Sequence, residues 1–223
     1  MKRVMGTAGA LALFAAAAVV SAQVPVDQEP HHTVRLDTIL LRVIEVTIAP
    51  GDKTLDHRHE RDIATIALND AQTTQREAGQ PLSSPDASLR GSVDVTEYTG
   101  KPGSHQVENT GTTPYHVIAV ENLRSGGWLQ TRPMTAAGTS LAQEGRALAV
   151  YDVRLGPGTS TTTHPHEMPV VIVLLSGEVE LSGSGGSQPS RITQPGQWVF
   201  IPGGHSLSVD ASGAAHLVEV EIR

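Results

Sequence analysis

The chain has 223 residues, of which 39% are hydrophobic, 17% charged and only 3% aromatic. This composition suits a folded protein of one large or two small domains, with a core built mostly from aliphatic side chains. The formal net charge of −7, without basic clusters, argues against a nucleic-acid partner. The absence of cysteine excludes disulfides, thiolate metal ligands and thiol catalysis.

The N-terminal segment, residues 1–22, has the pattern of a signal peptide. Lys2 and Arg3 precede an uncharged apolar run, and Val20-Ser21-Ala22 fits a small-residue cleavage site. We therefore expect cleavage after Ala22, a periplasmic or secreted protein, and no membrane association after cleavage. The alternative is an uncleaved anchor, for which the run is marginal because a crossing helix needs about 20 apolar residues. Residues 23–35 then form an N-terminal arm.

The rest of the chain contains an internal repeat. The segment "LRVIEVTIAPG" (41–51) matches "LAVYDVRLGPG" (148–158) at an offset of 107 residues. The segment "PGSHQVENTGTTPYHVIAVE" (102–121) matches "PGGHSLSVDASGAAHLVEVE" (202–221) at an offset of 100 residues. We infer two copies of one module.

Each copy is predicted to be a small all-β domain. The copies cover residues 36–122 and 145–223, and a linker covers residues 123–144. Their apolar runs are short and end in Pro-Gly or Ser-Gly turns, as strands do. Short strands at such spacing are typical of a sandwich or barrel. Eight of the ten histidines take paired positions in the two copies, so the histidines need an explanation.

Two of these pairs have the pattern His-x-His. His57 and His59 in the first copy correspond to His164 and His166 in the second. Residues two apart on a strand point to the same face, so each pair can project into its barrel. Two such imidazoles can bind one metal ion, and imidazole suits Zn, Cu, Fe and Ni. The alternative is that these histidines only form hydrogen bonds inside the barrels.

The motifs resemble those of the cupin family. Both copies have the spacing of the first cupin motif, Gly51-x5-His57-x-His59 and Gly158-x5-His164-x-His166. Parts of the second motif occur as Gly196, Pro202 and His205 in the second copy and as His105 and Asn109 in the first. The resemblance covers nearly all of the mature chain. It implies a bicupin, with two tandem cupin-type small β-barrels, each a double-stranded β-helix.

The resemblance also implies metal ligands in both barrels. These are His57, His59 and His105 in the first barrel and His164, His166 and His205 in the second. The glutamate of the motif falls near Asp62 in the first copy, so Asp62 completes that site, whereas the second copy has Pro169 and Val170 there. The first barrel is the better predicted site for a divalent metal such as Fe, Mn, Zn or Ni. The second is either a three-histidine site or a degenerate structural copy.

Two classes of function remain open at this point. One is an exported metal-binding enzyme that acts on a small polar molecule by dioxygenase, isomerase or hydrolase chemistry. The other is a non-catalytic periplasmic protein that binds a small ligand or a metal. Both have a small molecule as partner, and strand edges leave a homo-oligomer open. An acid or base beside the metal that does not ligate it would favour the enzyme.

Overall fold

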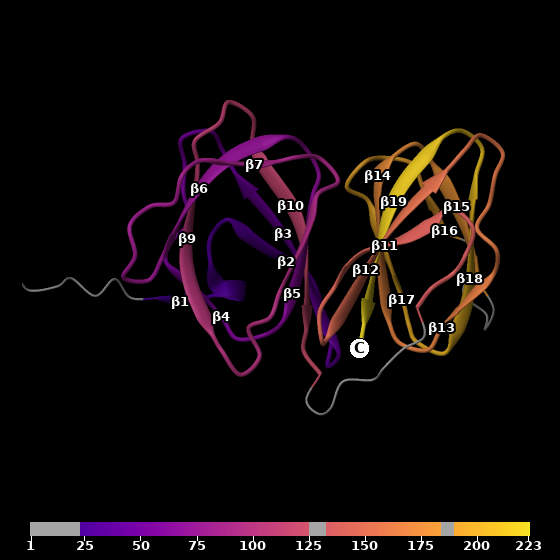
Figure 1. Cartoon of the computed structure of the whole chain (residues 1–223), viewed down its shortest axis with the longest axis horizontal. Coiled ribbons are helices and arrows are strands. Elements are labelled where there is room, and N and C mark those ends of the chain that lie inside the picture. The colour runs from indigo at the N-terminus through magenta and orange to yellow at the C-terminus, as the bar shows by residue number, and fades with distance from the viewer. Residues whose placement is uncertain (1–22, 125–132, 184–189) are drawn as a thin grey trace, which may run out of the picture.

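The structure is a computed structural model that describes residues 23–124, 133–183 and 190–223. These residues form 19 strands and one short 3-10 turn, η1 (Val26–Gln28), so the all-β prediction is confirmed. The strands form two barrels that stand side by side (Figure 1). The predicted signal peptide and the central part of the predicted linker lie outside the described residues. In the described ranges, no helix is long and apolar enough to cross a membrane.

The first barrel is built from two five-stranded sheets. We call one the histidine sheet; its order is β1 (Val24–Pro25), β4 (His57–His59), β9 (Gly103–Asn109), β6 (Ala71–Glu77) and β7 (Asp86–Ser88). We call the other the contact sheet; its order is β2 (His32–Asp37), β3 (Leu41–Ile48), β10 (Tyr115–Asn122), β5 (Ile63–Ala67) and β8 (Val93–Thr96).

The second barrel repeats this topology. Its histidine sheet has the order β13 (His164–His166), β18 (His205–Ala211), β15 (Val179–Gly183) and β16 (Ser190–Ile192). Its contact sheet has the order β11 (Thr139–Glu144), β12 (Leu148–Leu155), β19 (Ala215–Ile222), β14 (Val170–Ser176) and β17 (Trp198–Ile201). The edge strands β2 and β11 thus belong to the sheets, although most of β2 and all of β11 fall in the predicted arm and linker.

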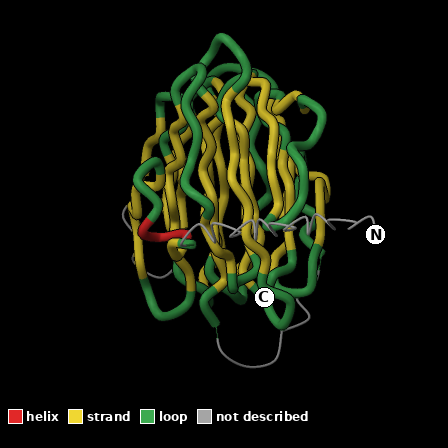
Figure 2. Tube along the Cα trace, turned by 90° about the vertical axis from the view of Figure 1, so that its left-hand side faces the viewer, coloured by secondary structure: helices red, strands yellow, loops and turns green. Residues whose placement is uncertain are grey.

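The two contact sheets pack against each other and share a core. In β3, Ile44 and Val46 point into the first barrel, whereas Leu41 and Val43 on the opposite face belong to a cluster that joins both barrels. Leu148 and Val150 of β12 belong to the same cluster. The strands of the barrels run in roughly the same direction (Figure 2), as in aligned sheet packing. Because these strands are apolar on both faces, their alternation in the sequence is imperfect.

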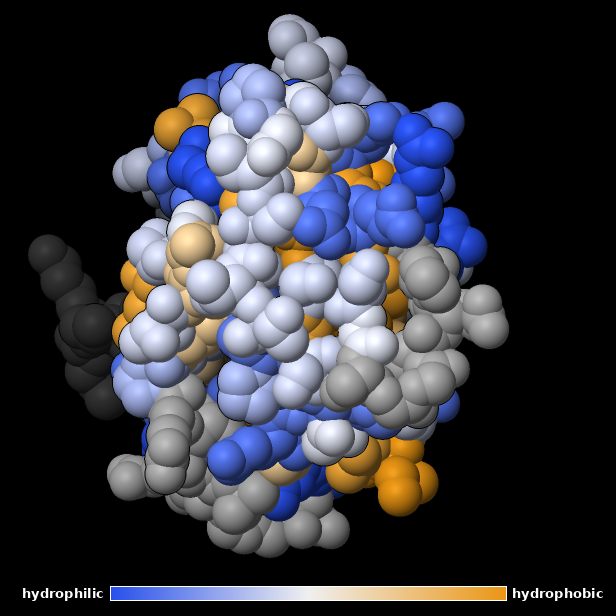
Figure 3. Space-filling view, turned by 90° about the vertical axis from the view of Figure 1, so that its right-hand side faces the viewer, coloured by the Kyte–Doolittle hydropathy of each residue, from blue (hydrophilic) through white to orange (hydrophobic). Residues whose placement is uncertain are grey.

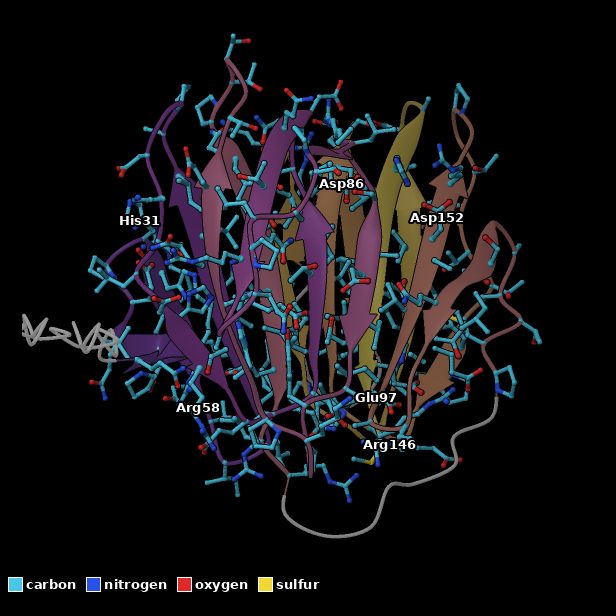
Figure 4. The ribbon with its side chains drawn as sticks, turned by 60° about the vertical axis from the view of Figure 1, so that its left-hand side comes forward. His31, Arg58, Asp86, Glu97, Arg146 and Asp152 are labelled. Carbon is cyan, nitrogen blue, oxygen red and sulfur yellow. The ribbon has the colours of Figure 1, made fainter. Side chains whose placement is uncertain are left out.

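Polar contacts border this shared core. The Nε atom of Arg146 in the second barrel lies 2.9 Å from a carboxylate oxygen of Glu97 in the first, and Figure 4 shows the two side chains together. The side-chain amide of Asn122 donates a hydrogen bond of 2.8 Å to the carbonyl of Ala147. The face of the second barrel that points away from the first carries mostly near-neutral to hydrophilic side chains, with scattered hydrophobic ones between them (Figure 3). The apolar surface of the contact sheets is therefore covered by the other barrel.

Candidate metal centre

Three histidines of the first barrel point toward one another from two adjacent strands. His57 and His59 on β4 are 1% and 5% exposed, and the residue between them is exposed. β9 places His105 directly opposite His57. The Nε2 atom of His105 lies 3.0 Å from Nε2 of His57 and 3.2 Å from Nε2 of His59. The structure therefore brings three of the predicted ligands to one point.

These three nitrogens are arranged to receive a cation. The Nδ1 atom of His57 lies 3.0 Å from the carbonyl oxygen of Leu55, so Nδ1 carries the proton and Nε2 keeps its lone pair. Two ligands at right angles, each about 2.1 Å from one ion, are about 3.0 Å apart, which is close to the observed separations. Burial lowers the pKa of His57 to about 4, of His59 to about 2 and of His105 to about 3. The imidazoles are neutral at pH 7 and fit a divalent metal.

Asp62, the predicted fourth ligand, does not belong to this group of three histidines in the described chain. Its carboxylate is buried, and one oxygen accepts a hydrogen bond of 2.7 Å from the backbone N–H of Thr99. β4 ends at His59, so the step to Asp62 crosses the turn into β5, and Asp62 does not line the cavity beside the histidines. One oxygen of Asp62 therefore contacts the loop around Thr99, and the structure does not bring Asp62 together with the three histidines.

The second barrel differs from the first at the third histidine. His164 and His166 again point inward from one strand, at 6% and 1% exposed. The residue opposite His164 is Leu207, and His205 lies opposite His166 instead. The turn between the last two strands has five residues in the first barrel and three in the second, which shifts β18 by two positions. His205 is therefore not the counterpart of His105. Two groups of side chains in the described chain could hold a metal ion, and we call them the metal-type groups: His57, His59 and His105, and His164, His166 and Glu219. His205 belongs to neither group.

In the second barrel, Glu219 is the third residue of the metal-type group. The ligands predicted from the sequence did not include it. It is 0% exposed, and one carboxylate oxygen lies 3.5 Å from Nε2 of His164 and 3.4 Å from Nε2 of His166. Its counterpart in the first barrel is Ala119, which lines the cavity. The internal repeat already aligns Ala119 with Glu219. A carboxylate at an inward position of the apolar segment "HLVEVEIR" was the signal that could have identified it.

The first barrel has a cavity of about 130 Å³ beside its histidines. An engineered cavity of about 150 Å³ holds benzene, so this space suits a molecule of one ring or smaller. The wall combines aliphatic side chains with polar groups, and the described residues that line it include no lysine or arginine. The polar residues besides the histidines are Thr54, Thr65, Gln75, Asp94, Thr96, Tyr98 and Tyr115.

The corresponding positions of the second barrel are apolar. The strand registers place Ile172 where the first barrel has Thr65 and Leu181 where it has Gln75. Together with Leu207 in place of His105, these side chains are 2% exposed or less and belong to one hydrophobic cluster. They fill volume that is open in the first barrel. One topology thus gives one barrel with space for a ligand and one with a packed interior.

The N-terminal arm forms part of the wall of the first cavity. β1 runs parallel to β4 and pairs Val24 with His57. Val26 and His32 both line the cavity. The ring of His32 meets the ring of His57 edge-on at 4.8 Å between centroids, and its Nδ1 lies 2.7 Å from the carbonyl oxygen of Val26. The sequence reasoning missed His32, because this histidine has no counterpart in the repeat.

Glu29 fastens this arm to the strand that carries the histidines. Its side chain is buried and accepts a hydrogen bond of 3.1 Å from the N–H of Leu55 and one of 2.7 Å from the N–H of His31. Burial alone would raise the pKa of Glu29, but the hydrogen bonds from His31 and Leu55 outweigh it and lower the pKa. Leu55 is also the residue whose carbonyl orients His57. The arm and the metal-type group are therefore connected through one backbone unit.

The last pair of repeated histidines lies outside both groups. His116 contacts Glu45 at 2.7 Å, and His216 contacts Asp152, the corresponding residue of the second copy. Asp152 lies on the outside of the barrel (Figure 4). These pairs join neighbouring strands of the contact sheets, which is a structural role.

The fold is similar to those of solved proteins with low sequence identity to this chain. No protein-family model and no curated protein sequence matches the chain. Among solved structures, AerE from Microcystis aeruginosa aligns with a TM-score of 0.66 and 16% identity, over 91% of this chain and 98% of its own. Salicylate 1,2-dioxygenase from Pseudaminobacter salicylatoxidans aligns with a TM-score of 0.63 and 13% identity, over 83% and 72%. With the repeated barrel and its two inward histidine groups, these likenesses show that the chain has the bicupin fold.

Proposed function

We propose that this chain is a metal-dependent enzyme whose catalytic metal is held by His57, His59 and His105. The observation that carries the proposal is the convergence of three neutral imidazole nitrogens beside a cavity. Three protein ligands leave coordination positions open, which is typical of a catalytic metal site. A divalent metal bound there supplies a Lewis acid or, if it is iron, the capacity for oxygen chemistry.

We propose that the reaction is the oxidation of a small, ring-sized polar molecule by O2. The fold likeness to salicylate 1,2-dioxygenase, which was also solved with gentisate adducts, supports this reaction type. The cavity volume of about 130 Å³ supports the substrate size. Because the described lining has no lysine or arginine, the metal would supply the counter-charge for an anionic substrate. Burial raises the pKa of Tyr115 to about 12, so its hydroxyl stays protonated and can donate to a bound ligand.

The residues around the metal group have separate tasks in this proposal. The carbonyl of Leu55 fixes the tautomer of His57 and so directs Nε2 toward the metal. Tyr98 stacks on His59 at 4.8 Å between ring centroids and holds that ring in place. Val26 adds an apolar side chain from the N-terminal arm to the cavity wall. His32 lines the cavity without joining the ligand group, so it is the additional acid or base that favours an enzyme over a binding protein.

We also propose that the protein is exported, which the sequence pattern of residues 1–22 supports. The test is to express the full chain in a Gram-negative host, to fractionate the cells and to determine the N-terminal residue. A mature chain that begins at Gln23 in the periplasm or medium is expected. An intact N-terminus in the cytoplasm would contradict export.

The test of the enzymatic proposal uses metal content and O2 uptake of the purified protein. Wild type is compared with His57→Ala/His59→Ala and with His116→Ala, which removes a histidine on the outside of the contact sheet. O2 uptake is measured with salicylate, gentisate and other hydroxybenzoates after loading with iron. The double variant is expected to lose one metal ion per chain and all uptake, and the control to keep both.

Two other outcomes are informative. Metal that binds in the first barrel without turnover of any tested substrate would favour the non-catalytic binding protein. Equal metal content in wild type and in the folded double variant would refute the first-barrel site.

A further inference from the structure

Five polar atoms lie buried together in the second barrel without a hydrogen-bond partner among the described residues. They are Nε2 of His164, both ring nitrogens of His166 and both carboxylate oxygens of Glu219. The three residues are 6%, 1% and 0% exposed, so solvent does not compensate them. Buried polar groups are nearly always hydrogen-bonded, and buried charges are paired or coordinate metals. This group therefore lacks a cationic partner.

The tautomer of His164 shows what kind of partner is missing. Its Nδ1 lies 2.8 Å from the carbonyl oxygen of Thr162, so Nδ1 donates and a neutral ring presents its Nε2 lone pair. That lone pair faces a carboxylate oxygen of Glu219 at 3.5 Å. Two acceptors that face each other repel unless a cation lies between them.

The separations match two ligands of one ion better than a hydrogen bond. Glu219 lies 3.5 Å from Nε2 of His164 and 3.4 Å from Nε2 of His166, whereas N–H···O bonds are usually 2.7–3.2 Å long. Two ligands at the tetrahedral angle, each about 2.0–2.1 Å from zinc, are about 3.3–3.4 Å apart. The geometry therefore leaves a space of the right size for a small divalent ion.

The donor set is complete for a closed site. The two Nε2 atoms and one oxygen of Glu219 provide three donors, and the second oxygen of Glu219, which is also buried without a partner in the described chain, can supply a fourth. The remaining ring nitrogen of His166, Nδ1, lies 3.5 Å from a carboxylate oxygen of Glu221, which is the arrangement of a carboxylate that orients a metal-bound histidine. The interior beside this group is filled by Ile172, Leu181 and Leu207. These side chains occupy the positions that border the open cavity in the first barrel.

We propose that His164, His166 and Glu219 form a closed structural site for zinc or a similar divalent metal. The histidines come from β13 of the histidine sheet and Glu219 from β19 of the contact sheet, so the ion ties the two sheets of the second barrel together. The third ligand is a carboxylate at the position where the first barrel has Ala119. This site does not depend on catalysis in the first barrel.

The test uses the full chain with His57→Ala/His59→Ala, which leaves only the second site. The protein is loaded with zinc and dialysed, and zinc per chain and Tm are measured before and after treatment with EDTA. About one zinc ion per chain is expected, and removal of zinc should lower Tm by at least about 5 °C. Substitution with Co²⁺ should give the visible absorption bands of a tetrahedral site.

Two further variants in this background complete the test. Glu219→Gln keeps the size of the side chain but removes its charge, and it should lose zinc and the effect of EDTA on Tm. Glu180→Gln changes an outward glutamate on β15 and should keep both. If the folded His57→Ala/His59→Ala protein holds no zinc and its Tm does not change with EDTA, the proposal is overturned. A protonated His166 between two carboxylates would then explain the group. If Glu219→Gln does not fold, absence of the Co²⁺ bands in the His57→Ala/His59→Ala protein overturns it equally.

Discussion

The metal-free protein is expected to lose stability as the pH falls below about 6.5. Burial lowers the pKa of His57 to about 4, of His59 to about 2 and of His105 to about 3 in the folded chain. In the unfolded chain each histidine titrates near about 6.5. Between these values the unfolded chain binds protons that the folded chain does not, so acid favours unfolding.

The size of this effect follows from the separation of the pKa values. At pH 5 each of the three histidines is expected to lower the free energy of unfolding by about 2 kcal/mol, or about 6 kcal/mol together. That loss is comparable to the total stability of many domains, about 5–15 kcal/mol. Above about pH 7 the three histidines are neutral in both states and contribute no pH dependence.

His166 acts in the opposite direction in the metal-free chain. Burial alone would lower its pKa, but the carboxylates of Glu219 and Glu221, 3.4 Å and 3.5 Å from its ring nitrogens, outweigh this and raise the pKa to about 9. Its contribution to stability is therefore complete below about pH 6.5 and is lost as the pH rises through 9. The metal-free protein should be most stable near neutral pH.

The assay is urea unfolding in the presence of a chelator, from pH 8 to pH 5, with metal-loaded protein as the comparison. His59→Gln removes one buried histidine and should reduce the slope of stability against pH between 6.5 and 5 by about one proton. Metal-free wild type that unfolds at the same urea concentration at pH 7 and pH 5 would refute the reasoning. An unchanged slope in His59→Gln would also refute it.

Three further predictions concern the cavity, its wall and the shared core. His32→Ala should keep the first-barrel metal but lower kcat/KM by about 10²–10⁴-fold, the usual range for a lost acid or base. His116→Ala is the control, and loss of metal in His32→Ala would contradict a non-ligating role. Thr65→Ile with Gln75→Leu copies the filled interior of the second barrel and should keep metal but abolish substrate binding, measured by calorimetry; unchanged affinity would place the substrate elsewhere. Leu148→Ala should lower the free energy of unfolding in urea by about 2–5 kcal/mol, since Leu148 is buried where the barrels meet; a change below about 1 kcal/mol would mean that the barrels are not coupled through this core.

The sequence alone determined the features that depend on local spacing. Residues two apart on a strand share a face, so the pair His57 and His59 and the pair His164 and His166 had to point the same way wherever the strand lay. Pro-Gly turns and short apolar runs fixed the all-β class. The repeat of 41–51 at 148–158 fixed the number of barrels.

Only the tertiary structure decided which residues from distant strands meet. A turn that is two residues shorter moves β18 along its neighbour, so Leu207 takes the place of His105, and His205 is displaced. Glu219 reaches the second metal-type group from the opposite sheet, and His32 reaches the first cavity from the arm. Such contacts depend on strand register and on how the sheets close into a barrel, and the spacing of residues within one strand does not contain that information.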